Sequence, residues 1–178
     1  MNVRVIAGKY GGRVLDAPPG LTTHPMGERI RGALFNILGG RIRGARVLDA
    51  FAGTGAIGIE ALSRGAKAAT FVERDKLAFT ILMKNLELLR IEDEATTTKA
   101  ALGAWVKTQR REKFDIIFAD PPYNAPQEVL VEKLAGNLKD DGILIMSRGT
   151  RREIRMPRLA LYESRAYGEA TLDFYTLA

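Results

Sequence analysis

The chain has 178 residues, 46% hydrophobic and 27% charged, which is typical of one soluble globular domain. It contains no cysteine and a single histidine, His24, which excludes disulfide scaffolds, cysteine-ligated zinc and thiol nucleophiles and argues against a histidine-rich metal site. No apolar run approaches the roughly 20 residues of a membrane span, and residues 1–8 lack an apolar signal core, so we expect a cytoplasmic protein with no membrane partner.

The net charge of +6 is concentrated at the N-terminus. Residues 1–46 hold eight basic and two acidic side chains, whereas the rest of the chain carries equal numbers of each sign. Seven of the eight cations are arginines, whose forked guanidinium group binds phosphate well. Clustered positive charge of this kind is typical of polyanion binding, and a basic face that serves only solubility is the alternative.

The first 40 residues predict a hairpin followed by a helix. Two short β-prone runs, Arg4–Ile6 and Arg13–Leu15, flank the glycine-rich segment 8–12 and indicate the hairpin. An apolar stripe at helical spacing then predicts a helix over Glu28–Leu38, which the pair Gly39-Gly40 ends.

From residue 46 onward, strands alternate with helices. The predicted strands are, in chain order, Arg46–Ala50, Ala68–Glu73, Ala95–Lys99, Phe114–Ala119 and Gly142–Met146. The predicted helices are Gly55–Arg64, Asp75–Leu89 and Gln127–Leu138. This alternation indicates an α/β fold with a Rossmann-like, mostly parallel sheet covered on both faces. Leu159–Arg165 and Thr171–Thr176 predict an antiparallel C-terminal hairpin at one sheet edge.

A glycine-rich loop follows the first strand of this alternating part. Gly53, Gly55 and Gly58 fit the pattern G-x-G-x-x-G between a strand and a helix, where glycine lets a ligand approach the helix N-terminus. Glu73 closes the next strand and can accept hydrogen bonds from both hydroxyls of an adenosine ribose. These features indicate a nucleoside cofactor without separating NAD from S-adenosylmethionine. A glycine turn that only packs the helix onto the sheet is the alternative.

The tetrapeptide Asp120-Pro121-Pro122-Tyr123 follows the strand Phe114–Ala119 at the same edge of the sheet. Asp120 supplies an acceptor, the prolines stiffen the turn without offering N–H groups, and Tyr123 supplies a flat face. This combination suits an exocyclic amine on a planar base that stacks on the ring. Such an amine is a weak nucleophile, so acceptors that orient its lone pair call for a sulfonium methyl as the electrophile. An ordinary Asp-Pro turn is the alternative.

The two motifs resemble those of amino-directed, S-adenosylmethionine-dependent methyltransferases. Three flanking segments are similar to the RsmD family, bacterial enzymes that methylate the N2 amine of a guanine in small-subunit ribosomal RNA. They are Arg4–Gly8 with Gly12–Leu15, Pro25–Leu38 and the ending from Tyr167 to Tyr175. The resemblance covers essentially the whole chain. It implies a class I methyltransferase fold, S-adenosylmethionine as cofactor with S-adenosylhomocysteine as product, no metal, and a monomer acting on 16S rRNA within an assembling small ribosomal subunit.

The resemblance and the charge pattern also imply the roles of segments and residues. Residues 1–45 would form a basic RNA-contacting appendage and residues 46–178 the methyltransferase domain. The implied catalytic and base-binding residues are Asp120, Pro121, Pro122 and Tyr123. The implied cofactor-binding residues are Asp49, Phe51, Gly53, Thr54, Gly55 and Glu73. The cations expected to contact RNA are Arg4, Lys9, Arg13, Arg29 and Arg31.

Three segments depart from the pattern of the resembled family. Lys99-Ala100-Ala101 stands where a polar residue often holds the cofactor's adenine, so adenine recognition would rest on backbone groups. Ser147-Arg148 stands where relatives often end the strand with an acid. His24, Met26 and Gly27 stray from the usual run before the basic helix. We interpret His24 as a surface or RNA-contacting residue, because amine methylation needs no strong base.

Three other functions remain open on the residues alone. Adenine-N6 methylation of DNA or RNA is the nearest, because the tetrapeptide fits either amine. An NAD-dependent oxidoreductase would explain Gly53–Gly58 and Glu73 but leave Asp120–Tyr123 without a role. A non-catalytic ribosome-assembly factor would leave the same tetrapeptide unused.

Overall fold

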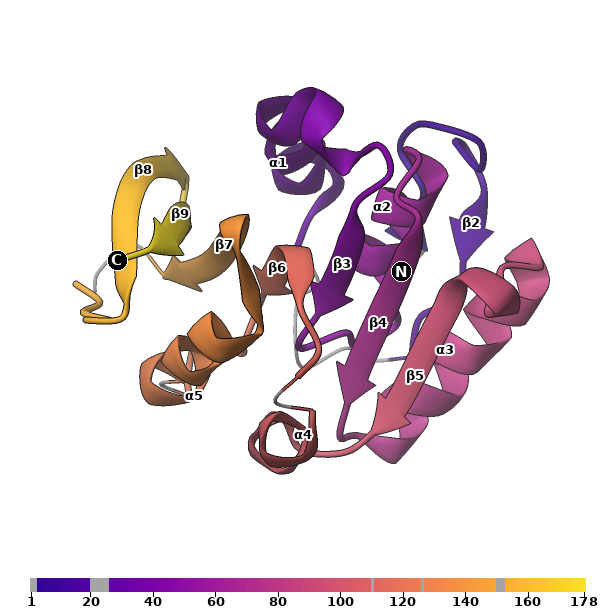
Figure 1. The fold of residues 1–178 in the computed structure, drawn as a ribbon. Coiled ribbons are helices and arrows are strands. Elements are labelled where there is room, and N and C mark those ends of the chain that lie inside the picture. The colour runs from indigo at the N-terminus through magenta and orange to yellow at the C-terminus, as the bar shows by residue number, and fades with distance from the viewer. Residues whose placement is uncertain (1–2, 20–25, 110, 126, 150–152) are drawn as a thin grey trace.

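The computed structural model describes residues 3–19, 26–109, 111–125, 127–149 and 153–178. Its centre is a seven-stranded mixed sheet (Figure 1). The strands of this sheet are β3 (Arg46–Asp49), β4 (Ala68–Glu73), β5 (Ala95–Lys99), β6 (Phe114–Ala119), β7 (Leu138–Gly149), β8 (Leu159–Tyr167) and β9 (Ala170–Leu177). A separate two-stranded hairpin pairs β1 (Val3–Arg4) with β2 (Val14–Leu15).

The strand order β5-β4-β3-β6-β7-β9-β8 contains one reversal that positions the site. The chain builds β3, β4 and β5 outward and then returns to place β6 on the other side of β3, all in parallel. β7 continues the parallel part, and β9 and β8 close the sheet as an antiparallel hairpin. Open α/β sheets bind ligands outside the carboxyl ends of the strands at such a reversal, here between β3 and β6. The predicted fold class is confirmed.

Helices cover both faces of the sheet. They are α1 (Glu28–Leu38), α2 (Ala56–Ser63), α3 (Lys76–Leu89), α4 (Leu102–Thr108) and α5 (Glu128–Lys133). One buried cluster joins α1, α2 and α3 to residues such as Val47, Phe118 and Ile145, and a second joins α4 and α5 to their strand neighbours, such as Leu48 and Leu144. Because side chains alternate along a strand, Asp49 lies on the same face of the sheet as Val47, which is the face that α2 covers. By the same alternation along β6 and β7, Asp120 and Ser147 belong to this face as well.

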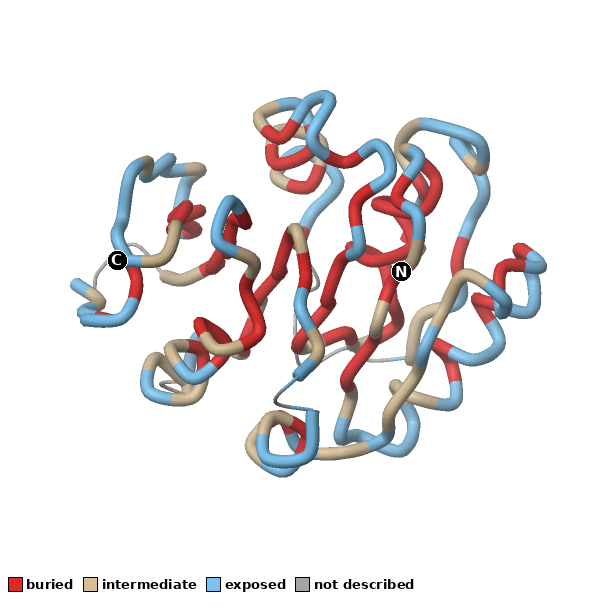
Figure 2. The backbone as a smooth tube through the Cα atoms, in the orientation of Figure 1, coloured by how far each residue is buried: buried red, intermediate tan, exposed pale blue. Residues whose placement is uncertain are grey.

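The N-terminal segment packs into the same core as the sheet. Val3, Val5 and Leu15 of the hairpin are buried, and they belong to the cluster that contains α1 and α2. The hairpin covers α2, which is buried at every residue and stands out in Figure 2 as a fully red helix. A helix that is buried at every residue requires cover on all sides, and the hairpin supplies the outer one. The predicted boundary at residue 45 therefore separates regions of different charge that share one core.

Several element boundaries differ from the sequence-based predictions. Helix α4 was not predicted, because it presents only two fully buried apolar side chains, Leu102 and Trp105. Trp105 lies in the core. Strand β7 starts at Leu138 rather than Gly142, since Leu138 pairs with Phe114 of β6. The predicted helix 127–138 ends early in a 3-10 turn over Leu134–Asn137, where the Asn137 amide donates to the carbonyls of residues 109 and 112.

Candidate active site

Asp49 ends β3 as a fully buried carboxylate. Its Oδ2 accepts a hydrogen bond from the Gly58 N–H at 3.0 Å, whereas Oδ1 has no hydrogen-bond partner among the described residues. Burial raises the pKa of Asp49 to about 7, the nearby negative charges of Asp120 and Glu73 act in the same direction, and the Gly58 N–H opposes them. A buried acid with one unpaired oxygen is costly unless a donor or cation satisfies it.

The glycine loop after β3 has the shape that the sequence predicts. Gly53 and Gly55 have positive φ angles of 55° and 88°, which the left-handed region allows for glycine. Open space faces Gly53, whereas a Cβ on Gly55 would lie 2.4 Å from Leu82 Cδ1. A Cβ on Gly58 would lie 2.3 Å from the Phe71 ring, so this third glycine lets α2 pack closely onto β4. The loop thus leaves room for a ligand on the side of Gly53.

Glu73 ties the end of β4 to this loop. Its Oε2 accepts from the Gly53 N–H at 2.8 Å, and its Oε1 accepts from the Asp75 N–H at 2.7 Å. Each oxygen keeps a second lone pair, so the carboxylate can still accept two hydroxyl donors. Phe51 is partly buried against the α4–α5 cluster, and Thr54 is buried within the loop. The structure therefore brings the predicted cofactor residues to one end of β3 and β4.

The segment after β5 offers the cofactor little on its own. β5 ends at Lys99, and the Ala100 N–H donates to the Glu73 carbonyl at 3.0 Å. The Ala100 N–H is thus already hydrogen-bonded to β4. A backbone hydrogen bond to adenine would have to come from a neighbouring residue. His24, assigned to the surface from sequence, lies outside the described residues.

Asp120 and Tyr123 follow β6, on the other side of the strand-order reversal. The Asp120 carboxylate is partly buried, and burial raises its pKa to about 6. Hydrogen bonds from the Ser147 hydroxyl and the Met26 N–H favour its ionised form. Tyr123 is 54% exposed, yet its hydroxyl lies 2.5 Å from Ser147 Oγ. Between them, Pro121 is buried and Pro122 is partly buried. The tetrapeptide thus presents a fixed acid and an accessible aromatic face.

A small pocket beside Asp120 is lined mostly by apolar side chains. Its lining comprises Met26, Leu34, Ile57, Phe118, Ala119, Ile145, Asp120 and Ser147. A larger cavity of about 420 Å³ lies between Ile37 of α1 and Tyr162 of β8 and reaches Ile143. Ile143 precedes Ser147 by four residues on β7, or about 13 Å of strand, so this cavity lies away from the acids. Nothing in its lining matches the predicted chemistry.

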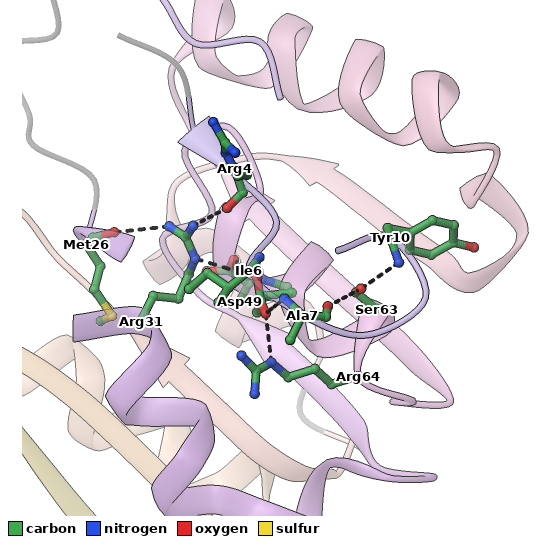
Figure 3. Close-up of polar contacts among 11 residues, drawn as sticks. Arg4, Ile6, Ala7, Tyr10, Met26, Arg31, Asp49, Ser63 and Arg64 are labelled. Carbon is green, nitrogen blue, oxygen red and sulfur yellow. Dashed lines mark hydrogen bonds and ion pairs between the residues drawn. The ribbon is translucent and has the colours of Figure 1, made fainter. Parts of the chain in front are cut away.

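Arg31 does not lie where the prediction of RNA contact requires. Its side chain is 1% exposed, and its guanidinium donates to the Met26 and Arg4 carbonyls (Figure 3). Its Nε lies 3.9 Å from Glu60 Oε2, and burial lowers the pKa of Arg31 while Glu60 opposes this shift. A guanidinium held in this way cannot reach a phosphate, so the assignment of Arg31 to RNA binding is corrected to a structural one. The sequence predicted RNA contact for this arginine because charged residues are rarely buried.

The hairpin is clamped to α2 by two polar side chains. Buried Glu60 accepts from the backbone N–H groups of Ile6 at 2.7 Å and Ala7 at 3.1 Å, and from Arg64 Nε at 2.7 Å. The Ser63 hydroxyl accepts from the Tyr10 N–H at 2.9 Å and donates to the Ala7 carbonyl at 2.6 Å (Figure 3). Arg4, Lys9, Arg13 and Arg29 keep exposed side chains on this anchored segment.

Asn85 is a further residue that the sequence did not single out. It is fully buried on α3, and its Oδ1 accepts from the Asp16 N–H at 2.8 Å. Its Nδ2 donates to the Asp16 carbonyl at 3.1 Å and to the Thr54 carbonyl at 3.0 Å. One amide thereby joins the N-terminal segment to the glycine loop. The available signal was a lone polar residue on the apolar stripe of a predicted helix.

Comparisons with known proteins agree with this geometry. The family described as "Conserved hypothetical protein 95" matches residues 3–176. The Escherichia coli protein "Ribosomal RNA small subunit methyltransferase D" is 37% identical over 142 residues, covering 80% of this chain and 69% of that protein. The Bacillus subtilis protein "Putative rRNA methyltransferase YlbH" is 32% identical over 182 residues, covering 97% of this chain and 98% of that protein.

Solved structures show the same fold. "Putative methyltransferase yhhF from Escherichia coli" has a TM-score of 0.88 at 31% identity and covers 99% of this chain and 98% of that one. "A putative sam-dependent methyltransferase from Streptococcus mutans" shares the fold at 17% identity, with a TM-score of 0.71, and covers 94% of this chain and 51% of that one. The fold, the glycine loop and the tetrapeptide define a class I methyltransferase. The family match and the curated relatives show that the chain belongs to the RsmD family.

Two further findings concern the described residues alone. They contain no helix both long and apolar enough to cross a membrane. Within the same ranges, no group of three or more histidine, cysteine, aspartate or glutamate side chains could hold a metal ion.

The raised pKa of Asp49 predicts a dependence of stability on pH. An unfolded aspartate has a pKa near 3.8, so between about pH 4 and pH 7 folded Asp49 keeps a proton that the unfolded chain has lost. The free energy of unfolding should therefore fall as the pH rises through this window. Asp49→Asn should remove this part of the fall, on the order of 3 kcal/mol, in urea unfolding without cofactor at pH 5 and pH 8.

Asp141→Asn is the matched control, because Asp141 is an exposed acid of β7. It should keep the wild-type dependence on pH. Equal slopes for wild type and Asp49→Asn would show that Asp49 is ionised in the folded protein throughout this range.

Proposed function

We propose that this protein transfers a methyl group from S-adenosylmethionine to the exocyclic N2 amine of a guanine in 16S rRNA. The observation that carries the proposal is the placement of Asp49 and Asp120 at the carboxyl ends of adjacent strands, β3 and β6, where the strand order reverses. One acid belongs to the glycine loop and the other to the tetrapeptide with the exposed tyrosine ring. The names of the Escherichia coli and Bacillus subtilis relatives support ribosomal RNA as the substrate.

The residues around Asp49 fit S-adenosylmethionine. The unpaired Oδ1 of Asp49 lies buried among other negative charges, and this cofactor carries an ammonium and a sulfonium group that would offset them. Glu73 would bind the ribose hydroxyls through its free lone pairs, while Phe51, Gly53, Thr54 and Gly55 would shape the cradle. When bound, the cofactor supplies an electrophilic methyl, which the amine takes up with loss of one proton as S-adenosylhomocysteine is released.

The tetrapeptide would bind and orient the base. Tyr123 offers its exposed ring for stacking, while Asp120 accepts a hydrogen bond from the exocyclic amine together with the Pro121 carbonyl. Pro122 stiffens the turn that holds these groups. An acceptor on the amine favours a pyramidal nitrogen with a directed lone pair, so most of the rate gain would come from positioning. Adenine N6 has the same hydrogen-bonding capacity, and identifying the methylated nucleoside decides between the two amines.

The basic segment would provide the contacts to RNA. Residues 1–45 carry exposed Arg4, Lys9, Arg13 and Arg29 on a hairpin and helix anchored beside the glycine loop, and residues 46–178 carry the chemistry. The proposed partner is rRNA in an assembling small ribosomal subunit, with the enzyme acting as a monomer in the cytoplasm. Phosphate contacts of arginine and lysine would place the target guanine near Tyr123.

Glu73→Ala should weaken binding of the cofactor. The variant removes the acceptor for the ribose hydroxyls as well as the bond to the Gly53 N–H, so the rise in melting temperature with S-adenosylhomocysteine should shrink at a fixed ligand concentration. Glu87→Ala, which removes an exposed acid on α3, should keep the wild-type response. NAD should shift none of the three proteins, and stabilisation by NAD without stabilisation by S-adenosylhomocysteine would overturn the cofactor assignment.

Asp120→Asn should abolish methyl transfer while leaving affinity for S-adenosylhomocysteine near wild type. The amide keeps the shape but replaces one acceptor oxygen with a donor, which repels the amine. We expect turnover to fall at least 100-fold, within the range for losing one positioned electrostatic group. Mass spectrometry of 16S rRNA nucleosides from cells lacking the protein, complemented with wild type or this variant, is the decisive measurement. Loss of N2-methylguanosine supports guanine, and loss of N6-methyladenosine would instead identify adenine as the substrate.

Arg13→Ala/Arg29→Ala should weaken RNA binding and reduce its dependence on salt. Each lost phosphate contact lowers the slope of log affinity against log salt by about 0.7–0.9, so the double variant should lose about 1.4–1.8. Lys67→Ala removes an exposed cation just before β4, at the end of the sheet opposite the site, and should leave the slope unchanged. Equal slopes for the double variant and wild type would show that the segment is a solvated basic face.

A further inference from the structure

Ser147 is buried at the point where β7 passes the tetrapeptide. It is 1% exposed, and it lines the small pocket together with Asp120. Its hydroxyl lies 2.5 Å from the Tyr123 hydroxyl, and it stands near enough to the Asp120 side chain to favour the ionised carboxylate as a hydrogen-bond donor. One small side chain therefore contacts both functional groups of the tetrapeptide from a different strand.

The chemistry of the three groups fixes the direction of these hydrogen bonds. An ionised carboxylate can only accept, so the Ser147 hydroxyl must donate its one proton to Asp120. Ser147 Oγ then accepts from the Tyr123 hydroxyl through a remaining lone pair. The result is a directed chain from the Tyr123 O–H through the Ser147 O–H to the Asp120 carboxylate.

The strand that carries Ser147 is held more firmly than the turn that carries Tyr123. Ser147 pairs with Leu172 in the β7–β9 ladder. The next residue, Arg148, forms an ion pair with buried Asp173 of β9 at 2.5 Å. Tyr123 lies instead in a turn outside helices and strands, and more than half of the residue is exposed. A hydroxyl fixed to the sheet can therefore set the place of an aromatic ring on a loop.

We propose that Ser147 is the positioning residue of the active site, fixing the Asp120 carboxylate and the Tyr123 ring in the relative arrangement that the target base requires. This inference rests on the proposed function for its catalytic meaning. Its structural part, the shared hydroxyl, holds whichever exocyclic amine is methylated. The other groups facing Asp120 are the Asp49 carboxylate, the Tyr123 phenol and the Met26 N–H, and the remaining pocket side chains are apolar.

The first test measures Asp120 without any reaction. Carboxyl-carbon NMR titration should show a wild-type carboxyl with a pKa near 6, assigned to Asp120 by its loss in Asp120→Asn. Ser147→Ala removes a donor to the ionised form, so this pKa should rise by about one unit. Tyr123→Phe leaves the Ser147 hydroxyl in place and should shift the pKa of Asp120 much less. An unchanged titration in Ser147→Ala would overturn the proposal.

The second test separates positioning from a general structural role. Ser147→Ala should lower kcat about 10-fold or more and move the acid limb of its pH profile upward, whereas affinity for S-adenosylhomocysteine should stay the same. Tyr123→Phe should lower kcat less than Ser147→Ala does. The kcat of the double variant should match that of Ser147→Ala, because the hydrogen bond of Tyr123 needs the serine hydroxyl. Ser147→Thr restores the hydroxyl and should recover the wild-type profile.

Ser164→Ala is the matched control. The Ser164 hydroxyl donates to Asp173 at 2.6 Å on the neighbouring hairpin, away from Asp120. Ser164→Ala should change the melting temperature at most, with no effect on the pH profile of kcat. If wild type methylates neither guanine nor adenine in RNA, the proposed function fails while the titration still decides the Ser147 contact. If wild type is active and Ser147→Ala matches it in both tests, the inference fails alone.

Discussion

The position of β6 beside β3 is the constraint on which the active site depends. Because these strands run parallel in register and side chains alternate, Asp49 and Asp120 reach the same face at the same end of the sheet. Ser147 of β7 lies on this face too, because Ile145 pairs with Phe118 of β6 and Ser147 follows Ile145 by two residues. Three polar groups far apart in sequence thus meet without any long loop having to place them. The cost is electrostatic, because two carboxylates share a poorly solvated site and the pKa of each is raised.

The buried Glu60 carboxylate holds the N-terminal segment against α2. It accepts two backbone N–H groups of the hairpin and lies between Arg31 and Arg64. A short hairpin with two residues in each strand is marginal in isolation. Here its backbone hydrogen bonds go to Glu60 and Ser63, and its apolar side chains enter the main core. The exposed cations of the segment therefore sit on a rigid support.

The sequence predicted the order of the elements and the bounds of β4, β5 and β6 well, because runs such as Phe114–Ala119 carry a strong signal. It also predicted which motifs meet, since parallel strands bring their carboxyl ends together. It failed for α4, where few apolar residues show a period. It placed Arg31 on the surface, because nothing local reveals that an arginine will meet a buried glutamate 29 residues later. The contacts of Asn85 and Ser147 were not predicted, because their partners are contributed by other elements.

The Asn85 amide has a consequence for how such a protein can change over evolutionary time. Because one side chain satisfies the backbone of Asp16 and the Thr54 carbonyl together, replacement of the first 45 residues by a segment from another protein would leave buried polar groups unmatched on α3. The N-terminal segment and the domain built on the sheet are therefore not interchangeable modules. New surface properties would have to arise by exchange of exposed side chains on the existing hairpin, with its backbone path retained.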